Sequence, residues 1–271
     1  MKDQTKHYDD ILSEASLIDA MAEICPMPRL SVHTVIDSTN AEAKRILLSN
    51  ETSPTLVVAE QQTAGRGRMG RSFYSPMQTG AYFSVAYVTD GTPESVVTLT
   101  GAVAVAVMRA IRRLTGIQTK IKWVNDLYLD DKKVCGILAE SIFGAFSDGL
   151  QRVVIGIGIN LHTCDFPDEL KGKAGALGAP TLTRAALIAA VWQELLPMLN
   201  APEDRSWLAD YRSYSYVLGK KIGWVEKGER HVGFADAIDA DGALIVHDEK
   251  GNATRLFTGE ISLFDYQSAE R

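Results

Sequence analysis

Apolar residues in the first two thirds of the chain follow two patterns, short continuous runs and longer helical periodicities. The short runs are typical of buried strands and lie at residues 32–36, 55–59, 81–88 and 153–159. Shorter strands are expected at 120–123, 127–129 and 134–141, the last two joined by a turn at 130–133. Helical periodicity predicts helices at 41–48, 93–114, 183–199 and 207–216, with a weak amphipathic stretch at 11–24. This region therefore mixes strands with helices.

The pattern changes after Leu218, where the β-prone runs become short and are separated by turn residues. They lie at 222–225, 231–238, 244–247, 254–257 and 260–264. Short, evenly spaced strands of this kind are typical of a small antiparallel barrel. We place a domain boundary near Val217, which divides the chain into an N-terminal extension (1–28), a first domain (29–217) and a second domain (218–271).

Charge and residue content narrow the class of protein. With 28 Lys and Arg against 34 Asp and Glu the net charge is −6, which argues against a protein that coats nucleic acid or an anionic membrane. We expect no membrane span, because the most apolar stretch, 96–108, is too short, and no signal peptide precedes it. The three scattered cysteines and five histidines form neither a disulfide framework nor a metal cage, which fits the cytoplasm. Any site for a phosphorylated substrate must be a small basic island.

Such an island lies between residues 61 and 79, which contain no acidic residue. Its centre combines glycines with three guanidinium groups, in the sequence Gly65-Arg66-Gly67-Arg68-Met69-Gly70-Arg71. Guanidinium groups donate paired hydrogen bonds to phosphate oxygens, and glycines allow the backbone to approach a ligand. The alternative without function is a basic loop exposed to solvent. The tight spacing in an acidic chain favours a polyphosphate site.

The same segment also matches the dinucleotide fingerprint G-x-G-x-x-G, with Asp90 about twenty residues beyond it. That fingerprint requires a helix that starts at the glycines and leads to the next strand. The residues between Gly70 and Ala81 include Pro76 and Gly80 and leave no room for such a helix. We therefore reject a dinucleotide site here. A Walker-type phosphate loop is absent from the sequence as well.

Two further segments have the composition of a binding site. Lys122-Trp123-Val124-Asn125-Asp126 places a cation, an indole, an amide and a carboxylate at a strand end, with Lys133 nearby. Asn125 and Asp126 are candidates to hold Mg²⁺ with substrate phosphates, although Asn-Asp is also a common turn pair and Trp123 is equally suited to a core. Gly156-Ile-Gly158-Ile-Asn160 places glycines inside a strand, which weakens it unless something lies against its backbone.

These segments together resemble the biotin protein ligases. The matches run in family order through Asp37-Ser38-Thr39-Asn40, Ala59 to Gln62, Gly65 to Arg71, Lys122 to Asp126, Lys133 to Leu138, Gly156 to Asn160 and Gly259 to Ser262. The resemblance implies an α+β fold, with a mixed β-sheet flanked by helices in the catalytic domain and a small SH3-like barrel after it. It also implies a two-step reaction. Biotin and ATP would give biotinyl-5′-AMP and pyrophosphate, and biotin would then pass to a lysine of a biotin carboxyl carrier protein of acetyl-CoA carboxylase.

The resemblance also implies roles for individual residues. Biotin would be bound by Ser38, Thr39, Asn40 and Gln62, and the carboxylate and α-phosphate by Gly65, Arg66, Gly67 and Arg68. Arg68 and Arg71 would reach ATP phosphates, and Lys133 would neutralise carboxylate or phosphate oxygens. ATP and Mg²⁺ would be served by Lys122, Trp123, Asn125 and Asp126, and the nucleotide by Asn160. The backbone at Gly136, Gly156 and Gly158 would lie against the ligand. Thr39 also has capping-box spacing to Glu42.

The chain departs from the family pattern at three positions. Val124 stands where proline is usual, Phe73 where many members have tryptophan, and Phe264 where arginine is common, which leaves a nucleotide contact from the barrel in doubt. We expect residues 65–74 to be mobile without ligand and to close over the adenylate.

Several alternatives stay open at this point. Residues 1–28 are too few for the DNA-binding domain of some members, so we expect no DNA binding and no membrane partner. The rival functions are a lipoate–protein ligase, a nicotinamide-dependent oxidoreductase and a non-catalytic biotin sensor. A monomer and a homodimer are both compatible with the sequence.

Overall fold

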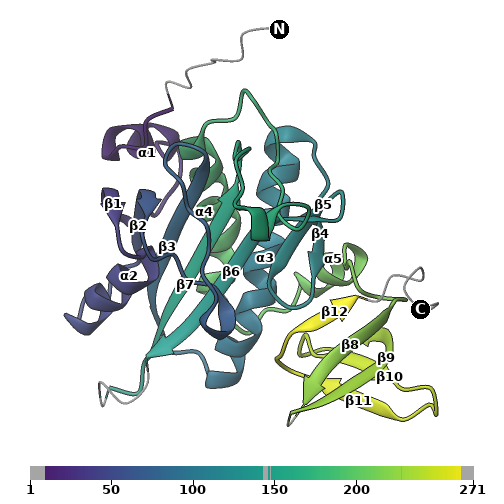
Figure 1. Cartoon of the computed structure of the whole chain (residues 1–271). Helices are drawn as coiled ribbons and strands as arrows, with labels where there is room; N and C mark the ends of the chain where they lie inside the picture. The colour runs from purple at the N-terminus through teal and green to yellow at the C-terminus, as the bar shows by residue number, and fades with distance from the viewer. Residues whose placement is uncertain (1–9, 143–145, 147, 227, 264–271) are drawn as a thin grey trace, which may run out of the picture.

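A seven-stranded mixed sheet forms the first domain (Figure 1). The computed structural model describes residues 10–263 apart from 143–145, 147 and 227, so Phe264 lies outside the described residues. In spatial order the strands are β1 (Arg29–Ile36), β2 (Thr55–Gln62), β3 (Gly80–Thr89), β7 (Gln151–Asn160), β6 (Lys132–Ile142), β5 (Asp126–Leu129) and β4 (Lys120–Lys122). Only β1 and β2 pair in parallel, and every other pairing in this sheet is antiparallel. The expected mixed sheet is confirmed.

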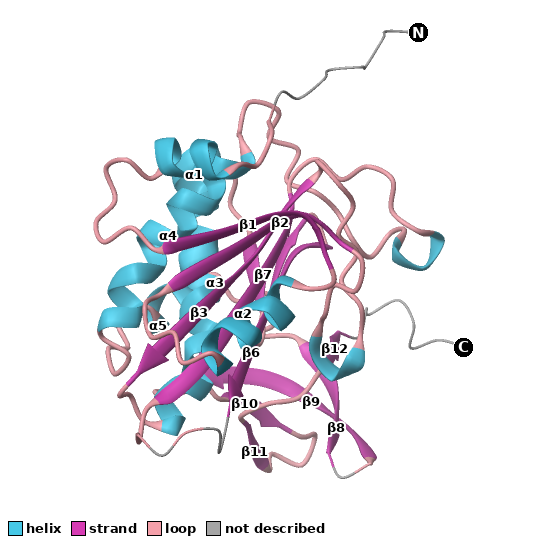
Figure 2. Ribbon diagram, turned by 90° about the vertical axis from the view of Figure 1, so that its left-hand side faces the viewer, coloured by secondary structure: helices cyan, strands magenta, loops and turns pink. Residues whose placement is uncertain are grey.

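Helices cover both faces of this sheet (Figure 2). The long helices α3 (Pro93–Thr115) and α4 (Arg184–Asn200) pack on one face, with the short helices α1 (Glu14–Ala20) and α5 (Leu208–Ser213) beside them. Helix α2 (Thr39–Leu48) lies on the other face. Side chains alternate between the faces of a strand, so in β7 Ile155 joins the large core while Val154 packs beside α2. Gly156 and Gly158 therefore face the α2 side.

The start of α2 differs from the sequence expectation. Ser38, not Thr39, is the N-cap residue, and its side chain makes no capping hydrogen bond. Glu42 pairs with Arg45 at 2.6 Å instead of reaching back to the helix start. The predicted capping box is therefore wrong. The Thr39 hydroxyl is turned toward Gln62, because the side chain of Gln62 accepts hydrogen bonds from both the backbone and the hydroxyl of Thr39.

A five-stranded antiparallel sheet forms the second domain. Its strands, in spatial order, are β11 (Ala253–Leu256), β10 (Leu244–His247), β9 (Glu229–Ile238), β8 (Lys221–Glu226) and β12 (Ile261–Leu263). This arrangement is consistent with the expected SH3-like barrel. Ile222, Leu244 and Ile261 belong to the same buried cluster as the core of the first domain. The two domains therefore share one continuous hydrophobic core.

A buried ion cluster ties the N-terminal segment to the first domain. The guanidinium of Arg184, fully buried at the start of α4, donates to Glu60 on β2 at 2.5 and 3.0 Å. Asp10 accepts from the Arg184 backbone at 2.7 Å, and the backbone of Leu12 donates to Glu60 at 2.7 Å. Because a buried charge is costly without partners, this cluster holds segment 10–12 against the sheet.

None of the helices in the described part of the chain has both the length and the apolar character that a membrane-spanning helix needs.

Candidate active site

A cavity of about 310 Å³ lies on the same face of the sheet as α2. Its volume falls in the range of small-molecule sites. The lining includes every residue to which the family resemblance gave a role except Ser38 and Gly65, which are both buried. Segments that are far apart in the chain therefore meet around one space.

The arginine-rich segment connects β2 to β3 and forms one wall of the cavity. Its two arms are joined by backbone hydrogen bonds, from Phe73 to Gly65 at 2.9 Å and from Gly67 to Arg71 at 2.7 Å. A Cβ atom at Gly65 would lie 2.5 Å from the carbonyl oxygen of Phe73, so this close approach requires glycine. Only a single 3₁₀ turn, Arg68–Gly70, follows the glycines. The absence of a dinucleotide-type helix here is confirmed.

Two arginines of this segment bind the second domain. Arg71 donates to both carboxylate oxygens of Glu260, at 2.5 and 2.6 Å. Arg68 donates to Asn125 in the first domain and to Thr258 in the second, both at 3.1 Å. The barrel segment 258–260 thus holds the arginine segment over the cavity.

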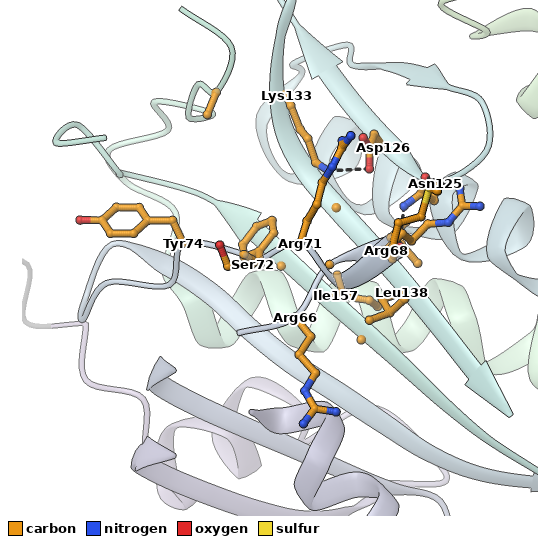
Figure 3. Close-up of a pocket in the computed structure, with 18 of the residues that line it drawn as sticks. Arg66, Arg68, Arg71, Ser72, Tyr74, Asn125, Asp126, Lys133, Leu138 and Ile157 are labelled. Carbon is orange, nitrogen blue, oxygen red and sulfur yellow. Dashed lines mark hydrogen bonds and ion pairs between the residues drawn. The ribbon is translucent and has the colours of Figure 1, made fainter. Parts of the chain in front are cut away.

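Arg66 takes a different direction from the other arginines. Figure 3 shows its side chain extending away from the group formed by Arg71, Asp126 and Lys133. It is exposed, and its charge contributes to lowering the pKa of Glu140 on β6. The basic island is therefore divided, with one guanidinium near α2 and the other cations at the opposite end.

A lysine–aspartate pair lies at that opposite end (Figure 3). Lys133 and Asp126 form an ion pair at 2.7 Å, and Lys122 lies over the ring of Tyr128 at 5.3 Å. Burial lowers the pKa of Lys122, while the charges of Asp126 and Glu260 partly oppose this. Six cationic side chains and only two carboxylates line the cavity, so the site attracts anions.

The other members of the Lys122–Asp126 motif have defined partners. Asn125 donates to the carbonyl of Ile137 at 2.7 Å, which leaves its side-chain oxygen directed to Arg68. Trp123 is 3% exposed, lines the cavity and donates to the carbonyl of Gly242 in the barrel, so the indole is held between the domains at the edge of the cavity. The Trp123–Val124 peptide bond is cis, and the Val124 carbonyl accepts from Tyr211 at 3.0 Å.

The strand glycines make room for side chains. Gly136 and Gly158 are paired across β6 and β7, and the ring of Phe73 rests on both. A Cβ atom would lie 2.5 Å from this ring at Gly158 and 3.2 Å at Gly136. At Gly156 a Cβ atom would lie 2.0 Å from the Asn40 side-chain oxygen. Glycine is thus required beneath Phe73 and beneath Asn40.

Neutral polar groups line the end of the cavity near α2. Gln62 accepts from the Thr39 backbone at 2.8 Å and donates to Ser75 at 2.9 Å, which fixes its amide.

Asn160, on β7, belongs to the end of the cavity near Lys133. Its side chain donates to the carbonyl of Gly175 at 3.0 Å, and the backbone of Gly175 donates to the carbonyl of Lys133. Its side-chain oxygen is buried and has no hydrogen-bond partner within the described part of the chain. Such a group has an acceptor position available for a ligand donor.

Some lining residues were not assigned by sequence reasoning. They include Tyr128, Phe166, Lys173 and Glu260. Lys173 is placed by backbone pairing between residues 173–175 and Lys133 at the start of β6. This contact joins a loop to a strand and has no local sequence signal. Glu260 belongs to the Gly259–Ser262 motif, so the sequence contained a signal that this segment lies near the site. Nothing in the sequence indicated that Glu260 pairs with Arg71.

Comparison with known proteins agrees with this geometry. The sequence profile of the biotin/lipoate A/B protein ligase family matches residues 32–160. The bifunctional ligase/repressor BirA of Bacillus subtilis is 33% identical over 246 residues, which cover 86% of this chain and 74% of that protein. The biotin–[acetyl-CoA-carboxylase] ligase of Paracoccus denitrificans is 32% identical, over 82% of this chain and 98% of that protein.

A solved structure is similar over nearly the same extent. The biotin protein ligase from Aquifex aeolicus, in complex with biotin and ATP, superposes with a TM-score of 0.72 at 26% identity. The match covers 88% of this chain and 99% of that one. With its mixed sheet, its second antiparallel sheet and its cation-lined cavity, this chain belongs to the biotin/lipoate A/B protein ligase family and, within it, to the biotin protein ligases.

Proposed function

We propose that this protein is an ATP-dependent biotin–[acetyl-CoA-carboxylase] ligase. The observation that carries the proposal is the distribution of polar and charged groups along the cavity described above. Neutral amides and hydroxyls of Thr39, Asn40 and Gln62 line one end, and most of the cations lie at the other. An uncharged ring with hydrogen-bond donors and an acceptor suits the first end of the cavity, and a triphosphate suits the second. Biotin and ATP together have this distribution of groups.

In the first step, an oxygen of the biotin carboxylate attacks the α-phosphorus of ATP. The bond from this phosphorus to the bridging oxygen breaks, and pyrophosphate leaves with the bonding electrons. Lys133 and Lys122 would neutralise the charge that gathers on the phosphate oxygens. Phosphate binding would compete with Asp126 for Lys133, because the two already form an ion pair. Catalysis then consists of positioning and charge stabilisation, without a protein nucleophile.

The nucleotide would lie along the same cavity. Adenine would lie beside the ring of Phe73. The buried side-chain oxygen of Asn160 would accept a hydrogen bond from the exocyclic amine of adenine. Arg68 and Arg71 would bind phosphates in exchange for their present partners Thr258 and Glu260. Nucleotide binding would in this way release contacts between the arginine segment and the barrel.

Magnesium is expected with ATP, and the cavity has one carboxylate suited to it beside the phosphate-binding cations. Mg²⁺ is usually bound through one or two carboxylates together with substrate phosphates. Asp126 lines the cavity and would hold the ion with phosphate oxygens, although no cluster of three carboxylate, histidine or cysteine ligands occurs in the described residues. When bound, the ion would offset charge on the phosphates.

In the second step, the neutral ε-amine of a carrier-protein lysine attacks the acyl carbon of biotinyl-5′-AMP. An amide forms, AMP leaves and the amine loses a proton. The relatives are named for acetyl-CoA carboxylase, and the partner would be the biotin carboxyl carrier protein of that enzyme. The first step uses ATP and the second uses a carboxylase subunit, and we place this activity in the cytoplasm, where both would be available.

Isotope exchange between pyrophosphate and ATP tests the first step. We expect exchange that requires biotin, with little exchange when lipoate replaces it. Exchange with lipoate alone would favour a lipoate–protein ligase, the rival within the same family. Transfer of labelled biotin to a carrier domain tests the second step. Biotin binding without any exchange would indicate a sensor instead of an enzyme.

A further inference from the structure

A three-residue loop carries much of the cavity wall at the end that we assign to the phosphates. It consists of Trp123, Val124 and Asn125 and joins β4 to β5. Its flanking residues, Lys122 and Asp126, pair across the two strands. All of these residues line the cavity except Val124. The shape of this loop therefore determines where the lining side chains on either side of it stand.

Each residue of the loop is held by a different part of the fold. The Trp123 indole donates to the barrel, and the Asn125 amide donates to a carbonyl of β6. At the centre of the loop, the Val124 carbonyl accepts from the hydroxyl of Tyr211 at 3.0 Å. Tyr211 lies on α5, 87 residues further along the chain. The middle of the loop is thus fixed by the hydroxyl of a residue that does not line the cavity.

The fold leaves the Tyr211 hydroxyl little freedom. The side chain is 1% exposed and packs edge-on against Trp207, with ring centroids 5.5 Å apart. Both rings rest on Gly101 of α3, where a Cβ atom would lie 2.8 Å from Trp207 and 3.5 Å from Tyr211. The neighbouring residue Asp210 accepts from Arg109 on α3 at 2.7 Å. Helix α5 is thus fastened to α3, and the hydroxyl is held at a defined point beneath the loop.

The direction of this hydrogen bond is fixed by chemistry. A backbone carbonyl only accepts, so the Tyr211 proton lies toward Val124. Burial raises the pKa of Tyr211 well above its ordinary value, and the charges of Arg68 and Asp126 have smaller effects on it. The hydroxyl therefore keeps its proton and remains a donor. Because a buried hydroxyl without a partner is costly, the contact with Val124 is maintained.

We infer that Tyr211 is a positioning residue for ATP, which acts on the lining side chains Lys122 and Asp126 from outside the cavity. Its hydroxyl holds the Val124 carbonyl and so keeps the loop in the shape that lets both side chains face the phosphates. This inference rests on the proposed function, in which the phosphates occupy this end. The end assigned to biotin is formed by α2 and β2, so the effect of Tyr211 should appear in ATP binding and not in biotin binding.

The substitution Tyr211→Phe tests this role because it removes the hydroxyl and keeps the ring that packs against Trp207. We expect KM for ATP in biotin-dependent pyrophosphate exchange to rise about fivefold, the scale of one hydrogen bond, while the Kd for biotin changes by less than about twofold. A merely structural role would give a different result. Partial unfolding lowers the amount of active enzyme and hence the apparent kcat, but leaves KM for ATP unchanged.

Tyr87→Phe is the matched control. The Tyr87 hydroxyl also donates to a backbone carbonyl, that of Leu199, and neither residue lines the cavity. This variant loses a comparable hydrogen bond and should keep the wild-type KM for ATP. Replacing Tyr211 by p-aminophenylalanine keeps the ring and a donor, and should bring KM for ATP back toward the wild-type value.

Hydrogen–deuterium exchange of the ligand-free protein gives a readout that depends on neither substrate. In Tyr211→Phe the peptide that contains residues 122–126 should exchange faster than in the wild type and in Tyr87→Phe, because the loop opens more easily when one contact is lost. Equal exchange in the three proteins would show that the hydroxyl does not hold the loop and would overturn the inference.

The kinetic outcomes decide the inference as well. An unchanged KM for ATP in Tyr211→Phe would overturn it, and so would an equal rise in Tyr87→Phe. A rise with p-aminophenylalanine as large as in Tyr211→Phe would also overturn it, since the donor is then not what matters. Absence of biotin-dependent pyrophosphate exchange in the wild type would overturn the proposed function instead, while the deuterium comparison would still show whether Tyr211 holds the loop.

Discussion

Arg71 and Glu260 form a two-point ion pair between the domains, with both carboxylate oxygens engaged at 2.5 and 2.6 Å. Both side chains are largely exposed, at 66% and 45%. Exposed pairs of this kind contribute at most about 1 kcal/mol to stability. The pair is therefore suited to hold the arginine segment in place reversibly, and ATP phosphates would compete with Glu260 for Arg71.

This relationship predicts how proteases will cut the arginine segment. Glu260→Ala should speed cleavage within residues 65–74 by up to about fivefold in the absence of ligand, the factor that corresponds to 1 kcal/mol. Biotin with ATP should slow cleavage in both the wild type and the variant, because the segment closes over the adenylate. Limited proteolysis with mass spectrometry locates the cuts. Equal cleavage with and without ligands would contradict closure.

The decline of activity at alkaline pH should depend on Lys122. Burial lowers its pKa below the ordinary lysine value of about 10.4, so it loses its charge at a lower pH than an exposed lysine. As pH rises through the lowered pKa, kcat/KM for ATP should fall. Lys122→Arg stays charged throughout and should move this decline to higher pH. A profile that does not differ between the two proteins would exclude Lys122 as its source.

Gly156 should tolerate no side chain while Asn40 is present. In Gly156→Ala the new Cβ atom meets the Asn40 oxygen at 2.0 Å, and overpacking of this kind costs about 1–3 kcal/mol. We expect lower stability in chemical denaturation and loss of biotin-dependent exchange. Adding Asn40→Ala should restore most of the stability but not the exchange. Full restoration of both would remove Asn40 from the binding site.

The buried cluster around Arg184 should be essential to the fold although it lies outside the cavity lining. Glu60→Ala leaves a fully buried guanidinium with fewer partners, and breaking such a pair costs about 3–5 kcal/mol. The double variant Glu60→Leu with Arg184→Met removes both charges, and its free energy of unfolding should fall much less than that of Glu60→Ala. Urea denaturation of the three proteins measures the difference. Equal losses in the single and double variants would contradict this explanation.

Local pattern was sufficient to predict most elements of the fold. Continuous apolar runs located the central strands, and the turn residues Asp130 and Asp131 marked the hairpin of β5 and β6. The capping box failed because its spacing is only local, and the Thr39 hydroxyl is taken by Gln62, 23 residues away. Tertiary contacts override such signals. The predicted helix at 207–216 is also shorter in the structure, at Leu208–Ser213.

The site was predictable where a motif carries its chemistry within a few residues. The arginines and Lys133 line the cavity as the sequence indicated. Pairings across the fold could not be predicted, because nothing local links Arg71 to Glu260 or Asn40 to Glu140. The same holds for Trp123, whose indole is bound to the carbonyl of Gly242. Composition marks which groups are present, but only the folded chain decides which of them remain available to a ligand.

The contacts of Arg68 and Arg71 with the barrel join positions 190 and 189 residues apart in the chain. During translation the arginine segment emerges long before Thr258 and Glu260 are made, and its guanidinium groups are then without these partners. Contacts that span so much sequence form late in folding. A ribosome-bound chain would therefore carry an open anion-binding segment, and an assembled catalytic centre would exist only after residues 258–260 have been made and folded.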